Sequence, residues 1–424
     1  MMDEKLFVGS LILVVILCYG ACDMNGVEYY KPEALATHFN GEQFVGTRTC
    51  MECHSDVYES HLLTAHYNTS AVAKSSNIKG SFDTGANTIN LEDSKIEMRS
   101  MRGSYFQEVQ LEEEENEKAS PLLQKMDIVI GSGIKGQSFL TWEDEKLFQL
   151  QASYSPPADK WINSPGFPEH LIKRPIRDGC LKCHVTFATN MDFAGQGNRY
   201  NSEKMIYGIG CEKCHRPSEK HVVFHRENPE IKTSRHMLKL DTLSRQFRLD
   251  VCAQCHSGSR AAILKGNSFS FLSGERLDEY SRNFYTGQKE SDLDVHGNQY
   301  GLLRSSQCFK QSLEMDCGTC HNPHMNQRGD TDYFNQKCAT CHTANTTNCS
   351  AETNELHEIG DNCIACHMPT IPSKAMALQV GAGSKQTGVL VRTHLIGIYA
   401  LEDDFIKQMD STSRNNIIGF IESQ

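Results

Sequence analysis

Hydrophobic residues first gather in one run near the start of the chain. The run Leu6–Tyr19 follows a single cation, Lys5, and is too short to span a bilayer comfortably. It ends in the small residues Gly20-Ala21 directly before Cys22, a pattern typical of bacterial lipoprotein cleavage sites. We therefore expect a signal peptide over residues 1–21 and a lipid anchor on Cys22, which would attach the mature chain to a membrane. An uncleaved anchor and plain secretion are the alternatives.

A second pattern, the alternation of apolar and polar residues in short runs, occupies the stretch from Tyr67 to Glu169. This stretch contains neither cysteine nor histidine, and turn residues separate its runs. Alternation with a period of two residues is typical of strands with one buried face. It predicts a small antiparallel β-meander, inserted over residues 80–165, with strands at 95–102, 105–111, 126–130, 137–142 and 146–151.

From about Ser164 onward the apolar positions show little regular period, and short helical patches alternate with many loops. Cysteine and histidine become frequent here, and six of the seven copies of the pentapeptide Cys-x-x-Cys-His lie in this part of the chain. In chain order the copies are Cys50 and Cys53 with His54, Cys180 and Cys183 with His184, Cys211 and Cys214 with His215, Cys252 and Cys255 with His256, Cys317 and Cys320 with His321, Cys338 and Cys341 with His342, and Cys363 and Cys366 with His367.

Each copy of the pentapeptide is typical of an attachment site for c-type haem. Two thiols about one helical turn apart can add to the two haem vinyl groups, and the adjacent imidazole can then reach the iron. Zinc ribbons are the alternative, because paired Cys-x-x-Cys units also form tetrahedral thiolate sites. Zinc ribbons do not require a histidine after the second cysteine, whereas all seven copies have one. The pattern therefore favours seven covalently attached haem c groups.

Closely spaced haems explain the weak periodicity after Ser164, because side chains that pack on porphyrin faces form no regular apolar stripe. The expected fold is therefore mainly α-helical, with irregular loops around a multihaem stack and one small antiparallel β insertion, α+β overall. The expected organisation is a signal peptide at 1–21, an N-terminal haem module at 22–79, the haem-free β insertion at 80–165 and a six-haem cytochrome domain at 166–424.

The charge of the chain limits its partners. The formal net charge is −11, and the propionates of seven haems would add to it. Strong negative charge argues against nucleic acid as a partner. A basic patch on another redox protein fits the charge better.

Spare histidines are numerous enough to complete the coordination of every iron. The chain has 18 histidines, the motifs use seven, and eleven remain. A second axial histidine on each of seven irons requires seven of them. Because the spare histidines cluster near the motifs in the sequence, a ligand role is favoured over a surface role.

Segments around the motifs carry a family resemblance. Phe44-Val45-Gly46-Thr47 before the first motif, with Tyr58, Thr64 and His66 after it, resembles the opening of the cytochrome c-554 type of multihaem electron carriers. Further similar segments cover nearly all of the mature chain, namely Gly210-Cys211-Glu212-Lys213-Cys214-His215-Arg216-Pro217 with His221 and His225, His296-Gly297-Asn298-Gln299-Tyr300, Cys320-His321-Asn322-Pro323-His324, His357 before Cys363, Cys366-His367-Met368-Pro369, and Arg392-Thr393-His394.

The resemblance implies a set of distal iron ligands, which are His66, His221, His296, His324, His357 and His394. His61 competes with His66 for the first of these roles. The seventh ligand has to come from His38, His61, His170, His225 or His236. We favour His225, which lies four residues after His221 and would share one helical face with it.

Motifs and resemblance together predict an exported, periplasmic or cell-envelope heptahaem cytochrome. It would relay single electrons between respiratory redox partners, such as a quinol-oxidising complex or other cytochromes, and would have no catalytic residues. The alternative is a multihaem oxidoreductase that acts on nitrite, hydroxylamine or another small oxyanion at one open-coordinate haem. The lysine-ligated motif of pentahaem nitrite reductases is absent, because all seven copies end in histidine. The electron carrier is therefore preferred.

Two cysteines of the mature chain, Cys308 and Cys349, belong neither to a motif nor to the lipid site. In an oxidising compartment an isolated pair of thiols tends to form a disulfide. Two buried, unpaired cysteines are the alternative.

Overall fold

The computed structural model of the chain describes residues 30–111, 120–283, 293–342 and 362–399. The expected signal peptide, Cys22, Cys349 and His357 lie outside the described residues. Within the described ranges, no helix combines the length and the hydropathy needed to cross a membrane.

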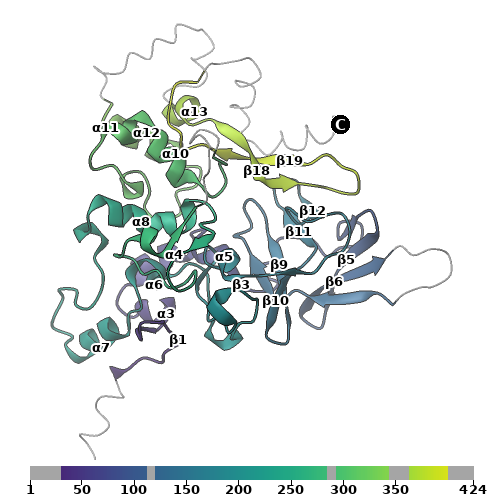
Figure 1. Cartoon of the computed structure of the whole chain (residues 1–424), viewed down its shortest axis with the longest axis horizontal. Coiled ribbons are helices and arrows are strands. Elements are labelled where there is room, and N and C mark those ends of the chain that lie inside the picture. Colours follow the sequence, from purple (N-terminus) through teal and green to yellow (C-terminus); the bar gives the residue numbers. More distant parts are fainter. Residues whose placement is uncertain (1–29, 112–119, 284–292, 343–361, 400–424) are drawn as a thin grey trace, which may run out of the picture.

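Helices and strands contribute nearly equally, at 26% and 25%, so the expectation of a mainly α-helical fold is wrong. The helices gather on one side of the molecule and most strands on the other (Figure 1). The helix content is lower than expected because a Cys-x-x-Cys-His unit needs only about one helical turn. Two motifs accordingly form helices of only five residues, α6 (Cys211–His215) and α13 (Cys363–His367).

Two antiparallel sheets form most of the strand side. The strand order is β13-β10-β9-β8-β3 in the larger sheet and β4-β5-β6-β7 in the smaller one. Their strands are β3 (Ser70–Val72), β4 (Thr88–Asn90), β5 (Ser94–Met101), β6 (Ser104–Leu111), β7 (Leu122–Lys125), β8 (Ile128–Ile130), β9 (Ser138–Glu143), β10 (Lys146–Gln149) and β13 (Arg174–Pro175). Because β3 precedes residue 80 and β13 follows residue 165, the larger sheet extends past both ends of the expected insertion.

The larger sheet separates two hydrophobic cores, because neighbouring residues on a strand face opposite sides. On β8 and β9, Val129 and Phe139 point into a core that is shared with the smaller sheet. This core also contains Trp161. Ile128 and Leu140 point the other way, into a core that includes residues of the second and first motif regions, such as Leu181 and Phe44. The β side is thus a packed support for the helical side.

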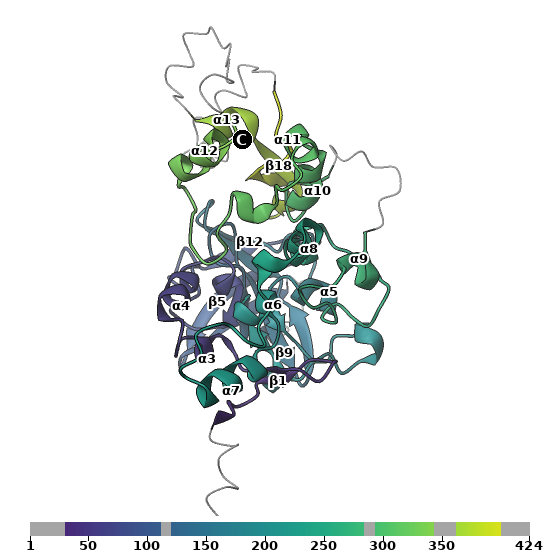
Figure 2. The ribbon, with the colours of Figure 1, turned by 90° about the vertical axis from the view of Figure 1, so that its left-hand side faces the viewer.

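The helical side follows one long axis of the molecule. Seen face on, α3, α7 and β1 lie at one end, α4, α6 and α8 in the middle, and α10, α12 and α13 at the other end (Figure 2). The remaining bounds are α3 (Thr47–Cys50), α4 (Ser55–Leu62), α5 (Asp178–Leu181), α7 (Glu219–Glu227), α8 (Arg245–His256), α9 (Leu277–Tyr280), α10 (Gln299–Ser305), α11 (Gln307–Gln311) and α12 (Thr331–Ala339).

Two-stranded ribbons supplement the sheets. They are β1 (Ala36–Thr37) with β2 (Gln43–Phe44), β11 (Ala152–Ser155) with β12 (Lys160–Asn163), β14 (Val185–Phe187) with β15 (Ile206–Tyr207), β16 (Ala262–Ile263) with β17 (Ser281–Arg282), and β18 (Thr370–Leu378) with β19 (Thr387–Arg392). The last hairpin reaches from the helical side to the strand side, where Leu378 and Val389 pack against Ile162 (Figure 1).

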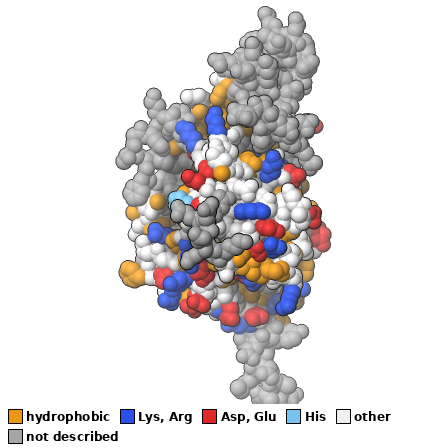
Figure 3. All heavy atoms as spheres, turned by 90° about the vertical axis from the view of Figure 1, so that its right-hand side faces the viewer, with side chains coloured by type: hydrophobic (Ala, Val, Ile, Leu, Met, Phe, Trp, Pro, Cys, Tyr) orange, Lys and Arg blue, Asp and Glu red, His pale blue; other side chains and the backbone are white. Residues whose placement is uncertain are grey.

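The outer face of the strand side carries mixed charges. In the view of Figure 3, basic and acidic side chains are interspersed over this face. A mixed surface produces no strong field of one sign that would steer a charged partner to it.

Candidate haem-binding sites

Three of the motifs, which are numbered 1 to 7 in chain order, share a local turn that brings their reactive groups together. In motifs 1, 5 and 6 the backbone N–H of His54, His321 and His342 donates to the carbonyl oxygen of the first cysteine, at 2.9 Å in each case. Residues three and four positions apart in such a turn lie on one face. Both thiols and the imidazole of a motif can therefore approach the same macrocycle.

Four motif histidines face a second histidine from a distant part of the sequence. The ring centroids of His54 and His221 are 6.4 Å apart with an interplanar angle of 17°, those of His215 and His324 are 6.1 Å apart at 14°, those of His256 and His66 are 6.1 Å apart at 79°, and those of His321 and His394 are 6.1 Å apart at 31°. A fifth motif histidine, His184, has His296 as a close neighbour, which adds to the effect of burial in lowering the pKa of His184.

These separations fit one iron between two imidazoles. A metal–imidazole bond is about 2 Å long, so two imidazoles on opposite sides of one metal have ring centroids roughly 6 Å apart. Burial lowers the pKa of His66, His184 and His394 to about 4, which keeps these imidazoles neutral. Neutral imidazole is the form that binds a metal.

Hydrogen bonds fix the orientation of the motif histidines, and sequence reasoning missed these partners. Such contacts hold the ring and leave its other nitrogen for the metal. They join Nδ1 of His184 to the Thr69 hydroxyl at 2.9 Å, Nδ1 of His215 to the Leu238 carbonyl oxygen at 3.2 Å, Nδ1 of His256 to Gln299 Oε1 at 3.3 Å, and Nδ1 of His367 to the Gly397 carbonyl oxygen at 2.8 Å. All four partners lie at least 23 positions from their histidine in sequence, and no local pattern identifies any of them.

Cysteines of different motifs meet in space, so the motifs form a continuous series. Three pairs of thiols from different motifs lie close enough that the second thiol raises the pKa of the first: Cys211 acts on Cys50 (motifs 3 and 1), Cys255 on Cys183 (motifs 4 and 2), and Cys317 on Cys252 (motifs 5 and 4).

The series continues to the far end of the helical side. Cys214 of motif 3 contributes to the raised pKa of Cys252 in motif 4. Burial and the nearby Cys338 of motif 6 raise the pKa of Cys320 in motif 5 to about 11. Burial and Cys363 of motif 7 raise the pKa of Cys338 in turn. The spatial order is therefore 1, 3, 4, 5, 6, 7, with motif 2 beside motif 4.

The zinc alternative needs four ligands around one ion. Among the described residues, no group of three or more histidine, cysteine, aspartate or glutamate side chains is arranged to hold a metal ion. Cys308, outside the motifs, contacts the Ser306 hydroxyl at 3.3 Å. Because its expected partner Cys349 is not among the described residues, the disulfide stays a prediction.

His225, which the sequence favours as seventh ligand, lies beside a distal candidate and not opposite a motif histidine. Its ring is 4.6 Å from that of His221. Its Nδ1 donates to the Ile231 carbonyl oxygen at 3.0 Å, and its Nε2 accepts from the Arg235 N–H at 3.3 Å. Both ring nitrogens are thus occupied by backbone groups, which is the arrangement of a supporting residue.

The other candidate ligands also have contacts away from the motif histidines that still lack a partner. His61 is buried and bonds through Nε2 to the Ile209 carbonyl oxygen at 2.9 Å. His38 bonds through Nε2 to the Phe269 carbonyl oxygen at 3.1 Å. The ring of His236 contacts Phe224 of α7, and His170 is exposed on the segment before β13.

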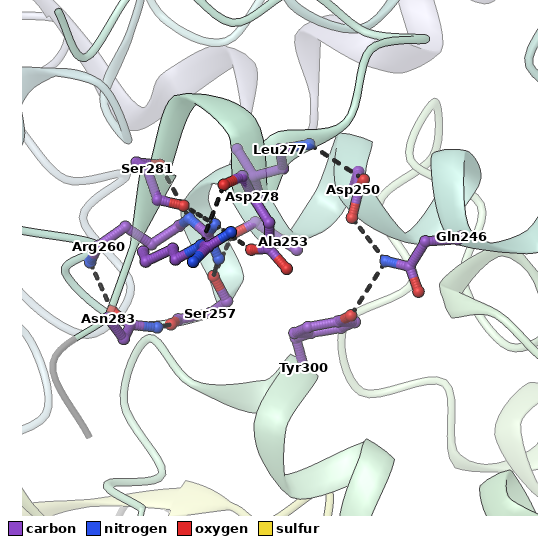
Figure 4. A network of polar contacts seen from close by, with 11 residues as sticks. Gln246, Asp250, Ala253, Ser257, Arg260, Leu277, Asp278, Ser281, Asn283 and Tyr300 are labelled. Atoms are coloured by element: carbon purple, nitrogen blue, oxygen red, sulfur yellow. Dashed lines mark hydrogen bonds and ion pairs between the residues drawn. The ribbon is translucent and has the colours of Figure 1, made fainter. Parts of the chain in front are cut away.

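A buried network holds α8, which carries motif 4. Arg260 donates to the hydroxyl groups of Ser281 and Ser257 at 2.9 and 3.2 Å and to Asp278 at 2.6 Å (Figure 4). Asp250 of α8 accepts from the Leu277 N–H at 3.1 Å and from Gln246 at 2.7 Å, and Gln246 also contacts the Tyr300 hydroxyl. The network joins α8 to α9 and α10.

Alanine in place of Arg260 should lower the free energy of unfolding by about 2 kcal/mol, because it leaves buried hydroxyl and carbonyl groups without their charged donor. The side chain is only 5% exposed. Denaturant unfolding of the matured protein, followed by absorbance, measures this. The matched control is Arg282→Ala, since Arg282 is exposed and donates to the Asp278 carbonyl oxygen. Equal stability losses in the two variants would contradict the expectation.

Comparison with known proteins gives three results. A family model described as "Cytochrome c554 and c-prime" matches residues 141–216, which include motifs 2 and 3. The multiheme cytochrome MtrA of Shewanella baltica is 29% identical over 189 residues, which cover 39% of this chain and 52% of that protein. The chain therefore spans about half the length of this curated relative.

A solved structure is similar in fold. The outer cell wall cytochrome OcwA superposes with a TM-score of 0.54 at 16% identity, covering 89% of this chain and 88% of that chain. At this identity the likeness concerns the fold alone. Together with the motifs, the sequence matches support a multihaem c-type cytochrome that binds haem c covalently.

Proposed function

We propose that this chain is an exported heptahaem c-type cytochrome that relays single electrons between redox proteins. Motifs 1 to 7 would each attach one haem, numbered alike, through the two cysteines, with the motif histidine as proximal ligand. When bound, the haem irons supply the redox chemistry by cycling between ferric and ferrous states. The observation that carries the proposal is the set of histidine pairs whose ring centroids are roughly 6 Å apart, the separation expected for two imidazoles on one iron.

The pairs supply a distal ligand for five haems. We assign His221 to haem 1, His296 to haem 2, His324 to haem 3, His66 to haem 4 and His394 to haem 5, in accordance with the ring contacts and, for haem 2, the proximity of His296 to His184. These five histidines are among the six that the family resemblance implies. His357 remains for haem 6 or haem 7, and His225 supports haem 1 without binding its iron.

The chain's own residues would hold the haems in a row, called the file below, that suits the transfer of electrons from haem to haem. The mutual pKa effects of cysteines in successive motifs support short distances between neighbouring macrocycles, in the order 1, 3, 4, 5, 6, 7 along the helical side (Figure 2). Electrons entering at one end of the molecule could then leave at the other. The β side would exclude water from one flank of the file.

The expected redox partners are consistent with a row of haems that has two ends. Redox proteins, such as a quinol-oxidising complex or other cytochromes, would donate and accept electrons at the two ends of the file. An exported location follows from covalent haem attachment, which in bacteria takes place outside the cytoplasmic membrane. Lipidation of Cys22 would keep the protein at a membrane of the cell envelope.

Protein matured in a host competent for cytochrome c assembly should carry seven covalent haems by intact-mass measurement. The control is the double variant Cys50→Ala and Cys53→Ala, which should carry six, because it removes both attachment thiols of motif 1. Zinc in place of haem, or fewer than seven haems in the unaltered protein, would refute the heptahaem proposal.

One observation favours the second candidate, an oxidoreductase with an open-coordinate haem. Of the eleven spare histidines, five face motifs 1 to 5, and five others, His38, His61, His170, His225 and His236, have their contacts elsewhere. Haems 6 and 7 are then left with one histidine, His357. An iron without a sixth protein ligand could bind nitrite or hydroxylamine.

A further inference from the structure

We propose that Glu212, a residue inside motif 3, positions both axial histidines of haem 1. The inference rests on the proposed function, because it assumes that motifs 1 and 3 bind haem. The Glu212 side chain is 2% exposed. Its Oε1 accepts from the N–H of Val45 at 3.0 Å and from the N–H and hydroxyl of Ser218 at 2.9 and 2.8 Å, and its Oε2 accepts from the N–H of Gly46 at 2.7 Å.

On one side, these bonds fix the segment that leads into motif 1. Val45 and Gly46 directly precede α3, and Gly46 is the residue that caps its N-terminus, with φ of 82°. The Val45 carbonyl oxygen accepts from the Thr49 hydroxyl at 2.9 Å, which joins this segment to the first turn of α3. Because α3 ends at Cys50 and His54 follows one turn later, Glu212 determines where the proximal ligand of haem 1 lies.

On the other side, the same carboxylate fixes the start of α7. Ser218 is the capping residue of α7, and its carbonyl oxygen accepts from the N–H of Val222 at 3.1 Å. His221 lies in the first turn of this helix and donates through Nδ1 to the Arg235 carbonyl oxygen at 2.7 Å. The position of the distal ligand of haem 1 therefore also depends on Glu212.

A second link between the two sides of haem 1 lies at the surface. Arg226 of α7 reaches Glu52 of motif 1 with two bonds of 2.8 Å, but the Glu52 side chain is 50% exposed. Exposed ion pairs contribute little, whereas removal of a buried acceptor leaves its donors unpaired. The near-parallel arrangement of His54 and His221, at 17°, is thus attributed to Glu212.

The test compares Glu212→Ala and Glu212→Gln with the matched control Glu52→Gln, a glutamate at a neighbouring position within motif 1. Carbon monoxide titration of the reduced, matured protein counts open irons. Glu212→Ala should retain seven haems and bind one equivalent more than the unaltered protein, because His221 leaves the iron. Glu212→Gln should change in the same direction but less, since an amide keeps one acceptor and loses the one that serves Gly46. Glu52→Gln should match the unaltered protein.

A second variant ties the effect to haem 1. His221→Ala should also add one equivalent of carbon monoxide binding, and the double variant with Glu212→Ala should add no more than one, because both changes open the same iron. Unchanged binding in both Glu212 variants, or a double variant that adds two equivalents, overturns the inference. If the Glu212→Ala variant does not mature with its haems, the carbon monoxide titration of the Glu212→Gln variant decides the outcome. Seven haems in the unaltered protein would leave the proposed function intact in either case.

Discussion

Replacement of His66 with alanine is expected to open the iron of haem 4, so that the reduced variant binds one equivalent more of carbon monoxide than the unaltered protein. His66 lies 6.1 Å from His256 between ring centroids, and desolvation lowers the pKa of its imidazole to about 4, so that it is neutral. Alanine offers no ligand, and the iron should become five-coordinate and high-spin. Carbon monoxide difference spectra and the high-spin absorbance of the ferric form measure the change.

The matched control is His61→Ala, five residues earlier in the chain. His61 is a buried histidine whose ring lies 6.5 Å from that of His324, but its Nε2 is engaged by the Ile209 carbonyl oxygen. We expect no additional carbon monoxide binding in this variant. If His61→Ala opens an iron and His66→Ala does not, the two roles are reversed.

Electron paramagnetic resonance should distinguish the signal of haem 4 from the signals of haems 1, 3 and 5. The planes of His66 and His256 are 79° apart, whereas the pairs at haems 1, 3 and 5 lie at 17°, 14° and 31°. Nearly perpendicular imidazoles give a strongly anisotropic low-spin signal, and nearly parallel ones give a rhombic signal. His66→Ala should therefore remove a strongly anisotropic signal and leave the rhombic signals in place.

The seven motifs could be recognised in the sequence as candidate haem attachment sites because their chemistry is local. The pentapeptide forms one turn, and that turn holds all of its reactive groups. Which candidate distal histidine faces which motif histidine could not be predicted, because it depends on the tertiary fold. His66 faces a histidine 190 positions later (256 − 66), and His221 faces one 167 positions earlier (221 − 54). A resemblance can mark such residues as candidate ligands without saying which iron each one would serve.

Predictions of strands succeeded where alternation was regular. The five predicted runs lie within about two residues of β5, β6, β8, β9 and β10. The edge strands β3 and β13 have only three and two residues, too few to display a period. The hairpin of β18 and β19 follows motif 7, and the pairing register of its strands shifts between Pro372 and Ala377. These omissions, together with the short motif helices, made the fold seem mainly α-helical.

The number of histidines available as distal ligands leads to a prediction for haems 6 and 7. Eleven spare histidines, less the five that face motifs 1 to 5 and the five engaged elsewhere, leave one (11 − 5 − 5 = 1), which is His357. Haems 6 and 7 need two. We therefore expect the unaltered, reduced protein to bind one equivalent of carbon monoxide, where seven complete histidine pairs would bind none.

Alanine in place of His357 should raise this capacity from one equivalent to two, because neither haem 6 nor haem 7 would then have a distal histidine. The matched control is His170→Ala, which replaces an exposed histidine on the strand side and should leave one equivalent. Titration with nitrite or hydroxylamine, followed by the high-spin absorbance, then asks whether the open iron accepts a substrate. Turnover of either would favour the oxidoreductase, and binding without turnover would favour the carrier. Absence of any carbon monoxide binding in the unaltered protein would contradict the histidine count and show that another side chain completes the last iron.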